Sequence, residues 1–270
     1  MKGTEFYKMS ATGNDFVIFD NRKGEIDAHV KDVREFVVKV CRRQQGVGAD
    51  GVILIEEAPD ADFAWRFFNS DGSEAEMCGN GGRCAARYAF LKGIAKAQMT
   101  FRTLAGLIKA EVSGRTVKLQ MTDPSDLRLD YPISLEEKEI FLSSVNTGVP
   151  HAVIVVDDIE HAPVHELGRQ IRHHKAFGER GTNVNFVKVI DRKNVAVRTY
   201  ERGVEGETLA CGTGAVAVAY TLKVKDMVDT PLNVHVRSGE MLRVHVEEAV
   251  FLEGGTRLIY TGVLHKEALL

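Results

Sequence analysis

Two short stretches of the same design, one in each half of the chain, constrain the fold more than any other feature. Each has a cysteine followed by Gly-x-Gly and then by small residues; Cys78 begins the first and Cys211 the second. The spacing between the two cysteines (211 minus 78) is 133 residues, and other landmarks repeat at nearly that spacing and in the same order. Thr12-Gly13 corresponds to Thr147-Gly148, and the stripe of Val30, Val33 and Val37 corresponds to that of Val164, Leu167 and Ile171. Further along, Arg66–Asn69 corresponds to Arg198–Glu201, and Gly106 to Gly239. A duplication of this length exceeds a solenoid repeat and predicts two domains of like fold.

The hydrophobic pattern predicts many short strands around a few helices. Strands are expected in a hairpin over 6–20 and at 52–55, 63–68, 99–103, 107–112 and 117–121, and helices at 29–42 and 82–91. The segment after each cysteine is small and apolar, and 215–220 is apolar all round, which is typical of a helix buried among other elements. We therefore expect an α+β fold of two similar domains related by a pseudo-twofold axis, each a curled set of mostly antiparallel strands around a central helix. The expected domains are 1–120 and 121–259, with a tail, 260–270, that returns to the first.

Composition and charge exclude several classes of protein. The chain has 270 residues, 44% of them hydrophobic, and a formal net charge of -3, with no basic cluster longer than Arg42-Arg43. A charge distribution without a basic cluster argues against binding of nucleic acid. The start, Met1–Glu5, has no apolar segment, and the longest apolar runs fall far short of the roughly 20 residues that span a bilayer. We expect a cytoplasmic protein with no membrane partner.

The four cysteines are too few, in a chain this long, for a disulfide scaffold, and their spacing matches no zinc motif. No metal is therefore expected. Cys41, beside a helical stripe, and Cys84, within the helix after Cys78, are interpreted as packing residues. The glycines of 46–51 precede a strand instead of opening a helix, which argues against a dinucleotide site. No lysine stands in a context that suggests a pyridoxal Schiff base, so we expect no cofactor.

Two thiols at helix N-termini could exchange the hydrogen of a carbon acid. If the two halves pack about a pseudo-twofold axis, equivalent loops meet and the thiols of Cys78 and Cys211 face each other. One thiolate could then remove a proton while the opposing thiol delivers another to the far face, which inverts the carbon. A helix N-terminus lowers the pKa of a thiol and its free N–H groups bind a carboxylate. This interpretation needs a small-molecule substrate with an acidic Cα–H.

Several stretches carry a family resemblance that covers essentially the whole chain. They are Lys8–Phe16, Phe68–Ser73, Cys78–Gly81, Glu201–Gly203 and Ala210–Gly214. Together they resemble the diaminopimelate epimerases. The resemblance implies an isomerase that interconverts LL- and meso-2,6-diaminopimelate without pyridoxal phosphate, in the synthesis of lysine and peptidoglycan precursors, on the two-domain fold of that family.

The resemblance also implies roles for single residues. Cys78 and Cys211 match the acid and base pair, and His151 and Glu201 match polar residues that assist at the thiols. Arg202 would clamp the distal carboxylate, because its guanidinium can bind both oxygens. The residues matching substrate-binding positions are Asn14, Asn69, Gly79, Asn80, Asn183, Glu201, Arg202, Gly212 and Thr213. The chain departs from the family pattern at Val149, where many relatives carry Asn, and at Gly51, where some carry Gln.

Other interpretations of the same residues stay open. The three asparagines at 14, 69 and 183 stand beside turn residues, where asparagine often closes a local turn, and a lone histidine before an apolar strand is often structural. A related isomerase, of the proline racemase or phenazine type, would share the fold. A thiol redox or ligand-binding protein would instead join Cys78 and Cys211 in a regulatory disulfide. A homodimer is expected only because symmetric dimers are common among soluble enzymes.

Overall fold

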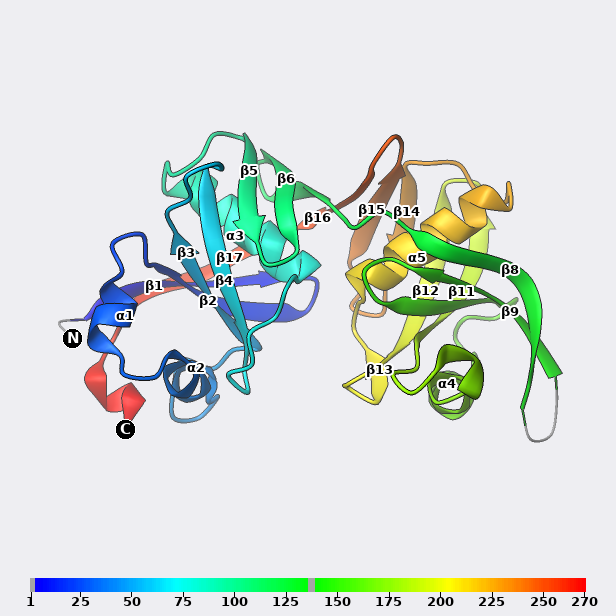
Figure 1. Ribbon diagram of the computed structural model, residues 1–270. Helices are drawn as coiled ribbons and strands as arrows, with labels where there is room; N and C mark the ends of the chain where they lie inside the picture. Colours follow the sequence, from blue (N-terminus) through cyan, green and yellow to red (C-terminus); the bar gives the residue numbers. More distant parts are fainter. Residues whose placement is uncertain (1–2, 136–138) are drawn as a thin grey trace. The chain divides into compact units, whose positions relative to one another are not determined.

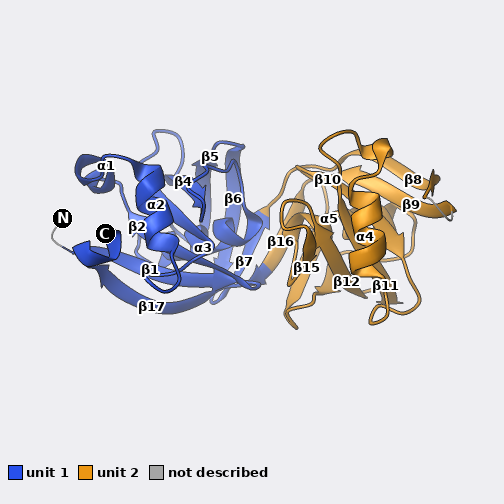
Figure 2. Cartoon of the chain, turned by 90° about the horizontal axis from the view of Figure 1, so that it is seen from below, with its two compact units in different colours: residues 1–119, 254–270 blue, residues 120–253 orange. Residues whose placement is uncertain are grey.

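The computed structural model describes residues 3–135 and 139–270 (Figure 1). Met1 and Lys2, which begin the amino-terminal stretch considered above, lie outside the described residues. The chain divides into two compact units (Figure 2). Unit 1 comprises residues 1–119 and 254–270, and unit 2 comprises residues 120–253. The carboxyl-terminal segment thus joins unit 1 from Gly254, where the sequence suggested residue 260.

Unit 1 is built on strands that pair in the order β17-β1-β2-β3-β4-β5-β6-β7. Their bounds are β17 (Arg257–Leu264), β1 (Thr4–Ala11), β2 (Asn14–Asp20), β3 (Gly51–Glu56), β4 (Phe63–Asn69), β5 (Gln98–Thr103), β6 (Gly106–Ser113) and β7 (Thr116–Gln120). The pairs β2–β3 and β4–β5 are parallel, and the other pairs in this order are antiparallel. The β1–β2 hairpin turns at Thr12 and Gly13, which both have positive φ (49° and 89°), as a type I′ hairpin turn requires.

Unit 2 repeats this topology strand by strand, in the order β8-β9-β10-β11-β12-β14-β15-β16. The bounds are β8 (Ser125–Ser134), β9 (Glu139–Asn146), β10 (Pro150–Val155), β11 (Asn183–Asp191), β12 (Asn194–Glu201), β14 (Leu232–His235), β15 (Met241–Val246) and β16 (Val250–Gly255). Here β10–β11 and β12–β14 are the parallel pairs, at the places of β2–β3 and β4–β5. An additional strand, β13 (Gly206–Thr208), pairs with the end of β12. The duplication read from the sequence therefore extends to the order and direction of the strands.

Each unit holds one helix among its strands, as expected from the apolar segments after the cysteines. These helices are α3 (Gly79–Leu91) in unit 1 and α5 (Gly212–Val224) in unit 2. From Ala215 to Ala219, every residue of α5 is at most 1% exposed, because strands β9, β10, β11, β14 and β15 all contact the helix. Helix α3 contacts β1, β2, β3 and β6 (Figure 1). The predicted α+β class with central helices is confirmed.

A second helix packs on the strands of each unit, α2 (Val33–Cys41) in unit 1 and α4 (Val164–Arg172) in unit 2. The stripe of Val164, Leu167 and Ile171 is buried, as the sequence predicts. Gly168 allows close packing of α4, because a Cβ there would lie 2.7 Å from the Cβ of Tyr200. Short helices complete the chain: α1 (Glu25–His29) and the 3-10 turns η1 (Lys175–Phe177) and η2 (Lys266–Leu269).

The single helix expected from His29 to Arg42 is wrong in its first part. Val30 is extended (φ −112°, ψ 121°) and ends α1, while the next helix starts anew at Val33. The cause is Asp32, whose carboxylate accepts a hydrogen bond from the backbone N–H of Arg34 at 2.8 Å and so caps a new helix. Val30 nevertheless packs against the same apolar cluster as Val33, which explains why the periodic pattern included it. In the described part of the chain, every helix is too short or too polar to span a lipid bilayer.

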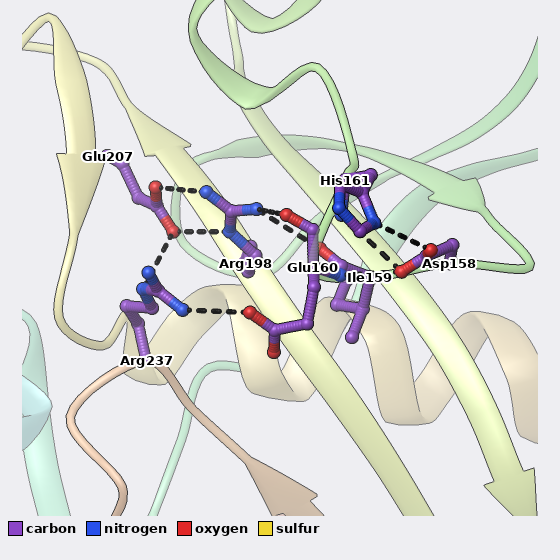
Figure 3. A network of polar contacts seen from close by, with 7 residues as sticks. All are labelled: Asp158, Ile159, Glu160, His161, Arg198, Glu207 and Arg237. Carbon is purple, nitrogen blue, oxygen red and sulfur yellow. Dashed lines mark hydrogen bonds and ion pairs between the residues drawn. The ribbon is translucent and has the colours of Figure 1, made fainter.

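An arginine-centred network ties β12 and β13 to the loop before α4 (Figure 3). The guanidinium of Arg198 donates two hydrogen bonds of 2.7 Å to the carboxylate of Glu207. It also donates to the carbonyl oxygens of Ile159 at 3.1 Å and Glu160 at 2.8 Å. Both charged side chains of the pair are largely buried (13% and 12% exposed), and Arg198 holds the pKa of Glu207 below its ordinary value. Arg198 thus links three segments of unit 2: β12, β13 and the loop before α4.

Arg198→Met is expected to lower the free energy of unfolding by about 2–4 kcal/mol, because it leaves the buried Glu207 carboxylate with only the distant Arg237, whose Nε lies 3.9 Å from it. Urea unfolding monitored by circular dichroism measures the change. Arg192→Met is the matched control, since Arg192 likewise forms ion pairs, with Asp226 and Asp229, but is 54% exposed. Exposed pairs contribute little, so this control is expected to change stability much less. Equal losses in the two variants would contradict the importance of burial at Arg198.

Candidate active site

The first cysteine stands at the start of α3. Cys78 is the N-cap residue, with extended backbone (φ −145°), and its Sγ accepts the N–H of Gly81 at 3.4 Å while its carbonyl oxygen accepts that of Gly82. The side chain is partly exposed. The helix begins at Gly79, earlier than the expected start near Gly82. Cys78 therefore occupies the helix N-terminus that the sequence predicts, where backbone N–H groups of the first turn have no partner within the helix.

A buried arginine organises the polar residues next to this helix end. Arg83 is 0% exposed, and its guanidinium donates hydrogen bonds of 2.6 Å to Asn80 Oδ1 and Thr12 Oγ1. Asn80 in turn donates to Asn14 Oδ1 at 2.5 Å, and Asn14 donates to Asp50 Oδ2 at 3.2 Å. The structure thus brings the sequence-predicted Asn14 and Asn80 together and orients both amides. The sequence analysis missed Arg83, although a charged residue in a small, apolar helix was a signal.

Asn69 behaves differently from the other predicted asparagines. Its side chain is exposed and donates to Ser73 Oγ at 3.0 Å, while its backbone N–H donates to the carbonyl oxygen of the same serine. In this structure it closes the local turn that its neighbours in the sequence suggest.

Gly51 is paired with Asn69 across the β3–β4 strand pair, and a Cβ at Gly51 would come within 2.6 Å of the carbonyl oxygen of Phe68. A side chain at position 51 would therefore need a shift of the backbone.

The second cysteine repeats the capping geometry but is buried. Cys211 caps α5, and its Sγ accepts the N–H of Gly214 at 3.4 Å and lies 3.4 Å from Thr213 Oγ1. Burial, reinforced by the negative charge of Glu201, raises the pKa of this thiol to about 12, although the bonds from Thr213 and Gly214 act in the opposite direction. Cys211 is therefore a protonated thiol near neutral pH. The expectation that a helix N-terminus lowers the pKa is wrong here, because desolvation is the larger effect.

Two further predicted residues follow one another at the end of β12. Burial raises the pKa of Glu201 above its ordinary value. The backbone N–H of the next residue, Arg202, donates to Asn183 Oδ1 at 2.7 Å, so the structure brings Asn183 and Arg202 together. Thr147, in the repeated Thr-Gly turn, donates to the carbonyl oxygen of Thr213 at 3.0 Å and fixes the turn against the start of α5. Gly212 and Thr213 form the first turn of that helix.

His151, at the start of β10, is fully buried. Burial, with a smaller contribution from the positive charge of Arg202, lowers its pKa to about 3, so the imidazole is neutral at physiological pH. Its Nδ1 lies 3.1 Å from the amide nitrogen of Asn185, a buried residue on β11. The sequence analysis did not single out Asn185; its only signal was a polar residue inside an apolar strand.

The remaining cysteines are packing residues, as predicted. Cys41 lies in the apolar cluster of unit 1 and Cys84 is 0% exposed, and burial raises the pKa of both thiols to about 12. Cys41, Cys84 and Cys211 are free thiols. Over residues 3–135 and 139–270, no three His, Cys, Asp or Glu side chains gather in a way that could hold a metal ion.

Comparison with known sequences gives one consistent family. The family model described as "Diaminopimelate epimerase" matches residues 6–127 and 143–259. A diaminopimelate epimerase of Aquifex aeolicus is 48% identical, with 98% of this chain and 99% of the relative covered. Relatives of the same name from Hydrogenobaculum and Archaeoglobus fulgidus are 45% and 41% identical and cover 96% and 98% of the chain, and 98% and 97% of their own lengths.

Solved structures share the fold at low identity. A phenazine biosynthesis protein of the PhzF family from Bacillus anthracis matches with a TM-score of 0.74 and 16% identity, covering 98% of this chain and 100% of that one. A probable proline racemase from Agrobacterium radiobacter matches with a TM-score of 0.69 and 16% identity, covering 96% and 92%. Likeness at this identity shows the fold alone, which confirms that the rival isomerases considered from sequence share it.

The buried, neutral His151 predicts a contribution to the pH dependence of stability. Its pKa is about 3 in the folded protein against 6.5 ordinarily, so the unfolded state binds a proton between these values and the folded state does not. Stability is therefore lost as the pH falls through this window, by up to about 1.4 kcal/mol per pH unit from this residue. Urea unfolding at pH 6.5, 5.5 and 4.5 is expected to show a shallower acid loss in His151→Gln than in the natural protein.

His161→Gln provides the control for that measurement. This histidine is exposed, and Asp158 raises its pKa, so its linkage has the opposite sign and its removal cannot make the acid loss shallower. An unchanged slope in His151→Gln would mean that His151 is protonated in the folded protein.

Proposed function

Because the chain belongs to the diaminopimelate epimerase family, we propose that Cys78 and Cys211 together invert one α-carbon of diaminopimelate, interconverting the LL and meso forms. The protein is accordingly an isomerase. The single observation that carries the two-thiol assignment is the duplicated cap: each unit places a cysteine sulfur at the N-terminus of its central helix, with the same N–H···S distance of 3.4 Å.

The proposed reaction moves one proton out and one proton in. A thiolate removes the α-proton of the substrate, and the electron pair left on the carbon spreads into the adjacent carboxylate. The unpaired N–H groups at the starts of α3 and α5 would bind that carboxylate and stabilise its growing charge, through Gly79, Asn80, Gly212 and Thr213. The other thiol then gives its proton to the opposite face of the carbon. Such a reaction requires no pyridoxal phosphate.

The ionisation state of Cys211 supports a role for it in this scheme. As a buried thiol beside Glu201, it holds its proton near neutral pH, which favours Cys211 as the proton donor in one direction of the reaction. Cys78, which has access to solvent, would be the base in that direction, and the two thiols would exchange roles in the reverse direction. Glu201 opposes loss of the proton from Cys211, because a thiolate there would face a second negative charge.

The remaining sequence-predicted residues would bind the rest of the substrate. Arg202 is proposed to bind the distal carboxylate, with Asn14, Asn69 and Asn183 contributing hydrogen bonds to that zwitterionic end. The backbone bond from Arg202 to Asn183 supports their joint role, because it fixes the two residues relative to each other. We further propose a cytoplasmic enzyme in lysine and peptidoglycan precursor synthesis, acting on a free amino acid.

Removal of either proposed catalytic thiol is expected to abolish racemising turnover. Cys78→Ala and Cys211→Ala should each lose at least about 10³-fold in the conversion of LL- to meso-diaminopimelate, since each lacks one of the two proton carriers. The measurement is incubation in deuterated water with chiral separation of products and mass spectrometry of the α-carbon label. Cys41→Ala, which removes a buried packing thiol, serves as the control and should retain turnover.

The same assay separates the rival functions. A proline racemase would label proline and leave diaminopimelate unlabelled, and a thiol redox protein would give no stereochemical turnover on either amino acid. Full turnover in one of the two cysteine variants would refute the paired-thiol mechanism while leaving the family assignment intact.

A homodimer is proposed from the contrast between two equivalent strands. The outermost strand of unit 1, β17, exposes Leu258, Ile259, Tyr260 and Val263, which are 39–65% exposed. The equivalent strand of unit 2, β8, instead presents charged residues. Both strands have bulges, β17 at Ile259 and β8 at two places, but only β8 also carries charges, which protect an outer strand from pairing with another chain, and β17 has none from Leu258 to Val263. We infer that a second copy of the chain covers β17.

Ile259→Glu is expected to shift the protein toward monomer in sedimentation velocity, because it places a charge in the proposed apolar interface. Leu129→Glu, on β8, is the matched control and should leave the sedimentation coefficient unchanged, although Leu129 is 40% exposed. A natural protein that sediments as a monomer at all concentrations tested would refute the dimer.

A further inference from the structure

Three buried polar side chains lie side by side on adjacent strands of unit 2. They are His151 on β10, Asn185 on β11 and Thr199 on β12, at most 3% exposed. The amide nitrogen of Asn185 lies 3.1 Å from His151 Nδ1 and donates to the carbonyl oxygen of Ala152 at 2.9 Å. The hydroxyl of Thr199 donates to Asn185 Oδ1 at 2.9 Å. Every polar atom of the Asn185 side chain is thereby engaged.

These contacts determine the tautomer of His151. The carbonyl oxygen of Ala152 can only accept, so the group facing it must be the NH₂ of Asn185 and not its oxygen. The second hydrogen of that NH₂ points to His151 Nδ1, which must therefore be the unprotonated nitrogen. A neutral imidazole carries one N–H, and it is consequently on Nε2. The neutral state is consistent with the lowered pKa of this residue.

The proton-bearing nitrogen is the one without a protein partner. Among the described residues, His151 Nε2 is buried and makes no hydrogen bond. An unsatisfied buried donor is costly, and native structures rarely keep one without a reason. An acceptor supplied by a ligand would satisfy it.

The first half of the chain shows that the fold does not need this polar group. In the matching strand registers, Phe16 takes the place of His151, Ile53 that of Asn185 and Phe67 that of Thr199. Phe16 and Phe67 pack edge to face, with ring centroids 5.9 Å apart. An apolar layer therefore supports the same strands and the same helix start in unit 1. The polar layer of unit 2 calls for a reason other than folding.

The polar layer also touches the second cysteine's helix. A Cβ added to Gly214 would lie 2.4 Å from Asn185 Oδ1 and 3.3 Å from Cys211 Sγ. The corresponding glycine of unit 1, Gly81, also faces Ile53 and its cysteine, but a Cβ there would lie at the looser distances of 3.4 Å from Ile53 and 3.5 Å from Cys78. Asn185 therefore lies directly behind the first turn of α5, between His151 and the cysteine cap.

We propose that Asn185, itself oriented by Thr199, is a positioning residue that keeps the proton of His151 on Nε2. His151 then presents a neutral N–H donor to an acceptor atom of the bound amino acid. It cannot accept a hydrogen bond from the ammonium group in that tautomer, nor carry the α-proton. Only the identity of the acceptor rests on the proposed function; the tautomer is a property of the free protein.

Nitrogen-15 NMR of protein labelled at histidine tests the tautomer directly. A protonated and an unprotonated ring nitrogen differ strongly in chemical shift, and the signals of His151 are those absent from the spectrum of His151→Gln. We expect Nε2 to be protonated and Nδ1 to be unprotonated in the natural protein. In Asn185→Asp, the carboxylate can only accept, so the proton should move to Nδ1. A natural protein with the proton on Nδ1, or an Asn185→Asp variant with it still on Nε2, would overturn the proposal.

Thr199→Val is a second variant, for the case in which Asn185→Asp fails to fold. It removes the hydroxyl that orients Asn185 Oδ1 at unchanged side-chain shape, and the two His151 tautomers should then appear as a mixture. Asn233→Asp, on β14 of the same unit, is the matched control, because Asn233 bonds to Asn194 and Arg243 instead. It should leave the His151 signals unchanged. A single Nε2-protonated form in folded Thr199→Val would count against the role of Thr199.

Kinetics give the functional readout. Asn185→Asp is expected to lower kcat/KM for diaminopimelate about tenfold, the size of one lost hydrogen bond. An unchanged kcat/KM with a moved proton would refute the donor role. Absence of turnover in the natural protein would contradict the proposed function instead, and the NMR result would stand apart from it.

Discussion

The capping of each central helix by a cysteine sulfur is the interaction on which the rest of the structure depends. A sulfur at the N-cap satisfies one backbone N–H of the first turn and leaves others free for an anion. Glycine is required three residues after Cys211, since a Cβ at Gly214 would lie 2.4 Å from Asn185 Oδ1, whereas a Cβ at Gly81 would make only ordinary contacts at 3.4 Å. The last glycine of the second Cys-Gly-x-Gly stretch is therefore required by packing.

The two units keep the same strand order, yet they surround their cysteines differently. Behind Cys78 the strands present Phe16, Ile53 and Phe67. The polar groups near Cys78 are instead Arg83 on α3 and the side chains of Asn80 and Asn14, which are linked to it by hydrogen bonds. Behind Cys211 the strands themselves are polar, and the cysteine is buried beside Glu201. A duplication thus supplies two equivalent helix ends, and the divergence of their surroundings makes the two thiols chemically unlike.

Much of the fold was predictable because local patterns and tertiary packing agree. The Thr12-Gly13 hairpin, the apolar stripe of α4 and the buried central helices all follow from turn chemistry and periodicity. The prediction failed at 29–42, where the cap at Asp32 divides a periodic stretch into two helices that bury the same face. Periodicity cannot detect such a break, because Val30 reaches the core from an extended segment.

Some features of the candidate site were predictable from the sequence, and others were not. The sequence by itself determined that the chain is duplicated, that a thiol begins each central helix, and which family it resembles, because these depend on residue order alone. Only the tertiary structure decided that Asn185 and Thr199 accompany His151, that Asn69 closes a turn, and that Cys211 and His151 are protonated and neutral respectively. The physical reason is desolvation: the charge state of a side chain depends on what surrounds it in space, and that environment is assembled from strands far apart in the sequence.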